Sequence, residues 1–188
     1  MLAFGLAWVT WSSSAHAAMI LDVADVGNDV IAIASGSVNT AGLSQAGSGG
    51  NNVGVQPNSG FFVIGGTTAS GWDSITGPAG FGPSPVYTPA SSVSGDTFGI
   101  FQFIGRLVLP INYVSGTPLF SAATFNNQSI SSLGLTEGTY VYSWGSGVTA
   151  DTLTINIPGI VPEPAGLSLL ALSVVGMLRP RRGGPAAA

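Results

Sequence analysis

The sequence predicts an all-β protein, a single antiparallel β-sandwich of the jelly-roll or immunoglobulin-like kind, over residues 18–158. Glycine and proline interrupt this body at short intervals, and no stretch of useful length has the period of an amphipathic helix. Between the interruptions lie short runs of β-branched and aromatic residues, which are typical of strands. No internal repeat recurs at a fixed period, so the sequence does not indicate a solenoid or a propeller.

The predicted strands follow one another along this body. They cover residues 29–35, which end at Gly36; 60–66, with glycine at both ends; 97–109, long enough for two strands or for one bent at Gly105; 139–144; and 151–157. The turn between the last two is expected at residues 145–147, where two glycines supply backbone freedom.

The last of these strands alternates between apolar and polar side chains. Because successive side chains of a strand point to opposite faces, one set is expected to face a core and the other to face water. The apolar set is Leu153, Ile155 and Ile157, and the polar set is Thr152, Thr154 and Asn156.

Two segments are predicted to be irregular. Residues 39–57 are rich in Gly, Ser, Asn and Gln, which indicates a long surface loop. Residues 71–89 contain four prolines including Pro89, and proline cannot donate a hydrogen bond to a strand ladder.

Composition narrows the class of protein. Only 6% of the residues are charged, 45% are hydrophobic and there are four tryptophans, which suits a secreted β-protein with a core and not a disordered chain. Cysteine is absent, so thiol catalysis and thiolate metal sites are excluded. If both ends are removed near Ala17 and Glu163, eight acids face one arginine, 1 − 8 = −7, which disfavours nucleic acid as a partner.

The first residues predict a signal peptide over 1–17. An apolar run over residues 1–9 leads to Ala15 and Ala17, the small-x-small pattern at which signal peptidase cleaves. No basic residue precedes the run, and a start codon farther upstream would supply one. The alternative is that this segment is a buried strand or helix.

The last residues have three parts. Pro162, Glu163 and Pro164 end any preceding strand, residues 165–178 carry no charge, and Arg179, Arg181 and Arg182 follow. As a helix, the fourteen uncharged residues span about 21 Å, less than the roughly 30 Å of a bilayer core. Residues 159–161 and snorkelling arginines extend that span, so we expect a transmembrane helix within 159–188 rather than a helix of the core.

In order and position these parts resemble the PEP-CTERM sorting signal, over about the last 25 residues. The resemblance implies an exported protein of a Gram-negative-type bacterium, held briefly in the inner membrane. It also implies an exosortase partner that reads Pro162, Glu163 and Pro164 and cuts near them. Pro180 interrupts the basic cluster and six residues follow it, both departures from the family pattern. Residues 36–43, 59–65 and 138–147 also resemble uncharacterised PEP-CTERM proteins, which implies an outer-surface or extracellular-matrix location and no chemistry.

The chain offers little for catalysis. Its one histidine, His16, lies in the predicted signal peptide, so the mature body has neither histidine nor cysteine for a catalytic triad. The body acids Asp73, Asp96, Glu137 and Asp151 are the candidates for a carboxylate pair, but nothing in the sequence pairs them. We therefore expect no enzyme, no cofactor and no metal.

Two further groups have alternative interpretations. Asp22, Asp25 and Asp29 could supply oxygen ligands to calcium, although their spacing fits no EF-hand and solvated acids are favoured. Trp72, Tyr140, Tyr142 and Trp144 could stack against sugar rings if exposed, whereas burial, which is favoured, makes them core residues. The predicted function is a structural or interaction protein, with a carbohydrate-binding module for extracellular polysaccharide as the alternative.

Overall fold

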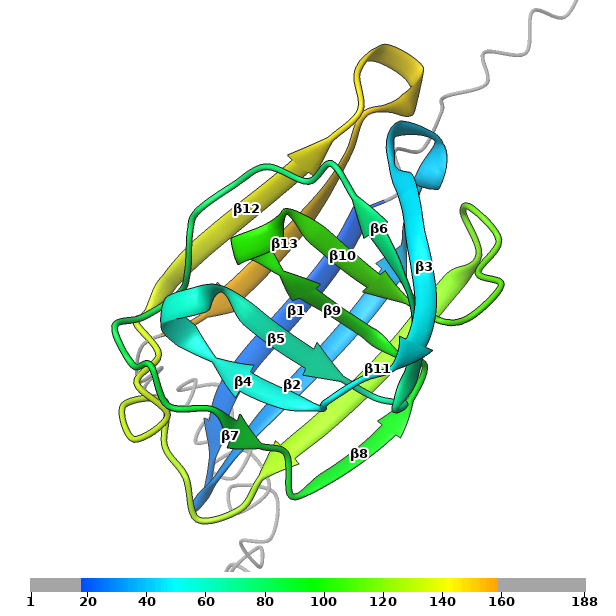
Figure 1. Ribbon diagram of the computed structural model, residues 1–188. Helices are drawn as coiled ribbons and strands as arrows, with labels where there is room; N and C mark the ends of the chain where they lie inside the picture. Colours follow the sequence, from blue (N-terminus) through cyan, green and yellow to red (C-terminus); the bar gives the residue numbers. More distant parts are fainter. Residues whose placement is uncertain (1–17, 159–188) are drawn as a thin grey trace, which may run out of the picture. The chain divides into compact units, whose positions relative to one another are not determined.

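The computed structural model describes residues 18–158, which form an all-β body without an α-helix (Figure 1). Its strands are β1 (Ala18–Val26), β2 (Asp29–Ser37), β3 (Ser44–Gly50), β4 (Gly54–Gln56), β5 (Phe61–Ile64), β6 (Thr68–Asp73), β7 (Thr88–Pro89), β8 (Ser92–Gly95), β9 (Phe98–Phe101), β10 (Arg106–Leu109), β11 (Pro118–Phe125), β12 (Gly138–Trp144) and β13 (Asp151–Ile157). Four single-turn 3-10 helices, η1 (Thr40–Gly42), η2 (Pro57–Ser59), η3 (Gln102–Ile104) and η4 (Gly147–Thr149), lie between strands.

The strands form two sheets. The first has the order β12-β13-β1-β2-β11-β8, and the second has the order β3-β6-β10-β9-β5-β4-β7. Neighbouring strands are antiparallel with one exception, since β1 and β13 run parallel over five register pairs from Ala18↔Thr152 to Asp22↔Asn156. The prediction of a wholly antiparallel fold is corrected at this pair. Parallel neighbours need a long connection, and here the rest of the described body supplies it.

A common core lies between the two sheets, which gives the body a sandwich-like arrangement (Figure 1). Its fully buried side chains come from both sheets: Met19, Leu21, Leu153 and Ile155 from the first, and Phe62, Ile64, Ile100 and Leu107 from the second. Each of these residues is flanked along its strand by a residue of the opposite face. The alternation of a strand therefore assigns one face of each sheet to the core.

Two predictions about particular strands are confirmed. In β13 the apolar set is buried and the polar set is half-buried, as the alternation indicates. Residues 97–109 form two strands, β9 and β10, and not one bent strand. The chain reverses between them at Gly105, whose φ of 64° is in the left-handed region that favours glycine.

The two segments predicted to be irregular contain strands. Residues 39–57 include β3 and β4, and residues 71–89 include the end of β6 and β7. All residues of β3 are exposed, so this strand has no apolar pattern and is held by backbone pairing with β6. The sequence reasoning also missed β1, although its buried Met19, Leu21 and Val23 alternate with exposed or half-buried residues. It missed β8 and β11 as well.

Within residues 18–158 no helix is long and apolar enough to cross a membrane. The predicted signal peptide (1–17) and the predicted transmembrane helix (within 159–188) lie outside the described residues.

We predict that Ile155→Ala lowers the free energy of unfolding by about 2–5 kcal/mol, because it leaves a cavity between the two sheets. Thr154→Ala, on the outward side of the same strand, is the matched control and should cost less than about 1 kcal/mol. Urea denaturation followed by tryptophan fluorescence measures both. Equal losses for the two variants would contradict the assignment of the faces of β13.

Candidate functional site

The aromatic residues of β12 do not form an exposed platform. Tyr142 is fully buried and Trp144 is 4% exposed, and the Trp144 Nε1 donates a hydrogen bond to the carbonyl oxygen of Asn39 at 2.8 Å. The outward positions of this strand are Val141 and Ser143. Sugar stacking by Tyr142 and Trp144 is therefore wrong, and the alternative of burial is confirmed for both.

The other two candidate aromatics are half-buried and pack against the same core. Tyr140 donates its hydroxyl to the carbonyl oxygen of Thr136 at 2.9 Å. Trp72 lies on β6 in the other sheet, and its Nε1 is buried with no hydrogen-bond partner among the described residues. The four predicted aromatics therefore serve the core from different sheets and do not form one surface.

The three aspartates considered for calcium each hold a different neighbour. Asp22 accepts from the Asn156 side chain at 2.8 Å, Asp25 from the Ile130 backbone N–H at 2.9 Å, and Asp29 from the Asn127 backbone N–H at 2.8 Å. Among residues 18–158 no group of three or more acidic or histidine side chains converges as metal ligands would. These carboxylates fasten β1 and β2 to their neighbours.

The candidate catalytic carboxylates also have separate surroundings. Asp96 accepts from the Phe120 backbone N–H at 3.1 Å, and Asp151 accepts from the Asn39 backbone N–H at 2.6 Å. Glu137 is exposed in the loop before β12, and Asp73 forms an ion pair with Arg106 on the second sheet.

That ion pair belongs to a row of side chains that the sequence reasoning did not find. Strand register aligns one residue from each of five neighbouring strands across the outer face of the second sheet: Asp73, Arg106, Phe101, Phe61 and Gln56. Directly opposite residues in antiparallel strands point to the same face. The outer face therefore carries charged groups toward one edge and aromatic rings toward the middle.

The charged end of the row is a bidentate pair. The Arg106 Nε lies 2.6 Å from Asp73 Oδ1, and the Nη2 lies 3.0 Å from Oδ2. The hydrogen bond from Arg106, with its positive charge, holds the pKa of Asp73 below its ordinary value, although partial desolvation opposes the shift. The same bond raises the pKa of Arg106. Arg106 is the only lysine or arginine in residues 18–158.

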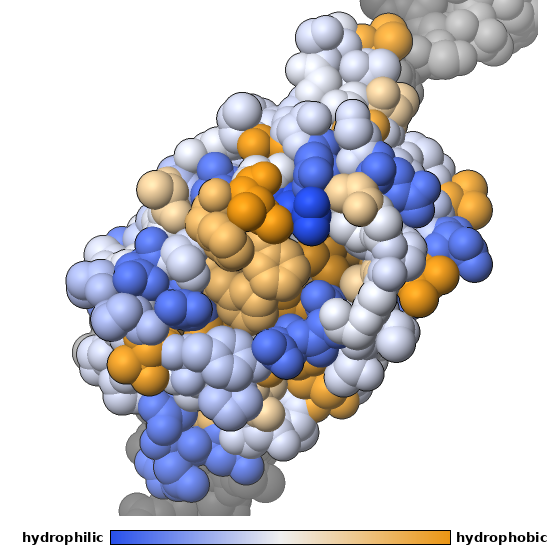
Figure 2. Space-filling view, in the orientation of Figure 1, coloured by the Kyte–Doolittle hydropathy of each residue, from blue (hydrophilic) through white to orange (hydrophobic). Residues whose placement is uncertain are grey.

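The aromatic end of the row is a chain of edge-to-face contacts. The ring centroid of Phe61 lies 4.7 Å from that of Phe101 and 5.6 Å from that of Tyr87, and Phe101 lies 6.4 Å from Phe103. Phe103 is 65% exposed on η3. Figure 2 shows apolar surface gathered in a recess in the middle of this face, with polar residues around it.

A second row beside the first is poor in side chains. In register across the sheet it contains Gly47, Gly71, Val108, Gly99 and Val63. Glycine at three of these five positions leaves the sheet surface low there. The side chain of Arg106 lies over Gly71, where a Cβ would approach its Cδ to 2.8 Å.

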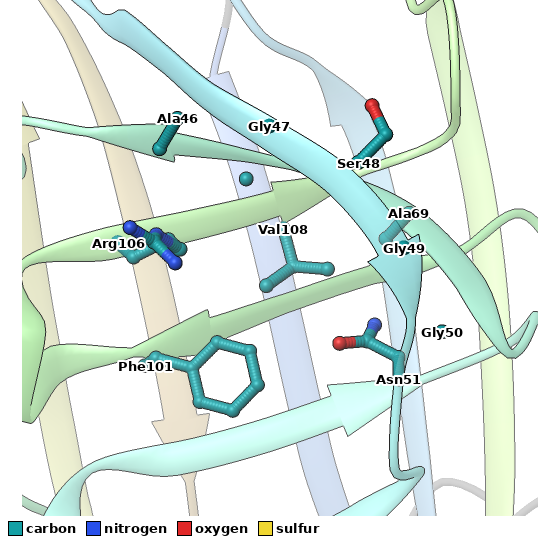
Figure 3. Close-up of a pocket in the computed structure, with 11 residues that line it drawn as sticks. Ala46, Gly47, Ser48, Gly49, Gly50, Asn51, Ala69, Phe101, Arg106 and Val108 are labelled. Atoms are coloured by element: carbon teal, nitrogen blue, oxygen red, sulfur yellow. The ribbon is translucent and has the colours of Figure 1, made fainter.

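These features enclose a hollow of about 260 Å³ (Figure 3). Its lining includes β3 backbone together with Phe101, which is on a strand three places away from β3 in the sheet order. A flat edge strand could not reach that far, so β3 curls over the outer face as a strap. A bulge between Gln45 and Gly47 and the scarcity of side chains in β3 permit this bend.

The hollow contains an unused hydrogen-bond donor. Asn51 follows β3, and its side chain extends toward Phe101 and Val108 (Figure 3). The Asn51 Nδ2 is buried and has no hydrogen-bond partner among the described residues. A buried donor without an acceptor costs free energy that an added acceptor would recover.

A wider depression of about 510 Å³ lies at the β1–β2 turn, between Asn28 and Gln128. Several of its polar groups already bond to neighbours, such as the Ser132 hydroxyl, which donates to Gln128 Oε1 at 2.8 Å. The hollow beneath β3 is therefore the better candidate site.

No protein-family model, no curated protein and no solved structure matches the chain.

We predict that Asp73→Asn lowers the free energy of unfolding at pH 7 by about 0.5 kcal/mol, a small value because both partners are partly exposed to solvent. The folded-state pKa of Asp73 is lowered, so the contribution is present above the ordinary pKa of 3.8 and is lost as the pH falls through the folded value. Urea denaturation at pH 7 and near pH 2 measures it. A deficit that persists at the lower pH would contradict an ionic origin.

Proposed function

We propose that the chain is an exported protein of a bacterial outer surface or extracellular matrix, processed by an exosortase and acting as a structural or interaction protein. The single observation that carries this proposal is the order of Pro162-Glu163-Pro164, an uncharged apolar run and the arginines at 179, 181 and 182. This order resembles the PEP-CTERM sorting signal, and arginines directly after an apolar run fit the positive-inside rule.

The described body is compatible with the proposal. Both predicted signals lie outside residues 18–158, which contain every described strand from β1 to β13. Removal of both predicted signals would therefore leave every strand of the described body intact. The paired termini β1 and β13 would both remain in the product.

The chemistry of the body supports an interaction role and not catalysis. Residues 18–158 contain no histidine or cysteine, and their acids outnumber their single arginine, 1 − 7 = −6. Such a surface repels nucleic acid and anionic lipid. We also propose that the fold is a jelly-roll or immunoglobulin-like sandwich. The two antiparallel-rich sheets around one core support this.

A carbohydrate-binding role is the second candidate function. The hollow beneath β3 favours it, because its lining includes an aromatic ring, an arginine held by a bidentate ion pair and an unused amide donor. The face of β12 no longer does, because Tyr142 and Trp144 are buried.

Intact-mass analysis of the native protein tests the processing. We predict a product that lacks residues 1–17 and everything beyond the Pro-Glu-Pro region, because both ends are read as cleavable signals. Glu163→Ala should leave the C-terminal segment attached while the N-terminal cleavage continues.

Ala17→Phe is the complementary variant, since signal peptidase accepts only small side chains at that position. It should retain the N-terminal segment. A native mass equal to that of all 188 residues would overturn the export-and-sorting proposal.

A further inference from the structure

We propose that the hollow beneath β3 binds one neutral pyranose ring of a polysaccharide. This inference deepens the second candidate function, and it requires the hollow to be open to solvent in the folded protein. It does not require the predicted processing, which has its own test.

The volume of the hollow limits the size of the group that can enter it. The hollow has a volume of about 260 Å³. A group of the size of one six-membered sugar ring suits that space, and the rest of a longer ligand would lie outside it. A polysaccharide would therefore present a terminal or side-branch residue to it.

The lining matches the two kinds of surface on a pyranose. Phe101 and Val108 supply an apolar floor, which suits the C–H face of a sugar ring. Arg106, which the carboxylate of Asp73 holds in place, and the backbone of β3 lie around that floor, where ring hydroxyls can donate and accept. A purely apolar ligand would form no hydrogen bonds with these polar groups.

Asn51 supplies the strongest single indication of a missing partner. Its buried Nδ2 can donate hydrogen bonds and has no acceptor among the described residues. A ring hydroxyl is an acceptor of suitable size for the narrow space between β3 and Phe101. Water is the competing occupant, and the binding experiment separates the two.

Charge excludes an anionic sugar as the preferred ligand. The one cation of the body, Arg106, is already neutralised by Asp73 in a bidentate pair. The other acids of residues 18–158 give the surroundings a negative potential. A uronic acid should therefore bind more weakly than its neutral counterpart.

The binding experiment uses the full chain, purified without carbohydrate-based detergents. Saturation-transfer NMR with glucose, galactose, mannose and N-acetylglucosamine should detect at least one ligand, with a dissociation constant on the order of 1 mM as expected for one small ring. Glucuronate is the charged comparison. Absence of transfer to every neutral sugar, or preference for glucuronate, overturns the proposal.

Two positions of β3 provide a matched pair of variants. Gly49 is opposite Ala69, a buried outer-face residue that lines the hollow, and a Cβ at Gly49 meets no atom within 4 Å. Gly49→Leu should therefore fill the hollow and weaken sugar binding at least tenfold. Gln45→Leu places the same side chain on β3 at an exposed position that does not line the hollow, and should bind within about twofold of the wild type.

Asn51→Leu tests the unused donor separately from the shape. Because it removes an unsatisfied polar atom, its thermal midpoint should equal or exceed that of the wild type, while sugar binding falls at least tenfold. Unchanged binding in both Gly49→Leu and Asn51→Leu would overturn the assignment of the site. If no sugar binds while the native protein is processed as predicted, only the sugar site is rejected. If sugar binds while the native protein is not processed, only the export proposal is rejected.

Discussion

The burial of alternate side chains between two sheets is the constraint on which the rest of the structure depends. On β5, β9 and β10 the inward positions are Phe62, Ile64, Ile100 and Leu107, all buried in the common core. Because strand side chains alternate, this leaves Phe61, Phe101, Arg106 and Val108 on the outer face. A shift of one residue in register would exchange the two sets, exposing the core and burying the ion pair. The same strand register therefore determines both the core and the candidate site.

Strand β3 is an edge strand that contributes no side chain to the core. It adds no residue to either hydrophobic cluster of the described body and stays in place through its ladder with β6. Freed from packing, it bends over the outer face and encloses space that its neighbours leave open. A glycine-rich segment usually indicates a loop, but here Ser44–Gly50 form a strand with a register shift between Gln45 and Gly47.

Apolar alternation indicated the inner face of β13, whereas residues 97–109 left two strands or one strand bent at Gly105 open, and the structure has two strands. The site could not be predicted in the same way. Asp73 and Arg106 are distant in sequence and meet only through the pairing of β6 with β10. On β12 the sequence favoured burial of the aromatic face, and the structure buries Tyr142 and Trp144 while Val141 is exposed. The predictions for residues 1–17 and 159–188 lie outside the described residues and stay predictions.

The parallel pairing of β1 with β13 has a mechanical consequence. The two strands are the first and last of the body, and their ladder runs from Ala18↔Thr152 to Asp22↔Asn156. Ala18 therefore lies at one end of the ladder, and Ile157 lies beyond the other end. A pull between these points slides one strand along the other, so the hydrogen bonds share the load and must break together, whereas a hairpin pulled open at its ends releases them one by one. The topology thus resists stretching along the line that joins the two ends of the body.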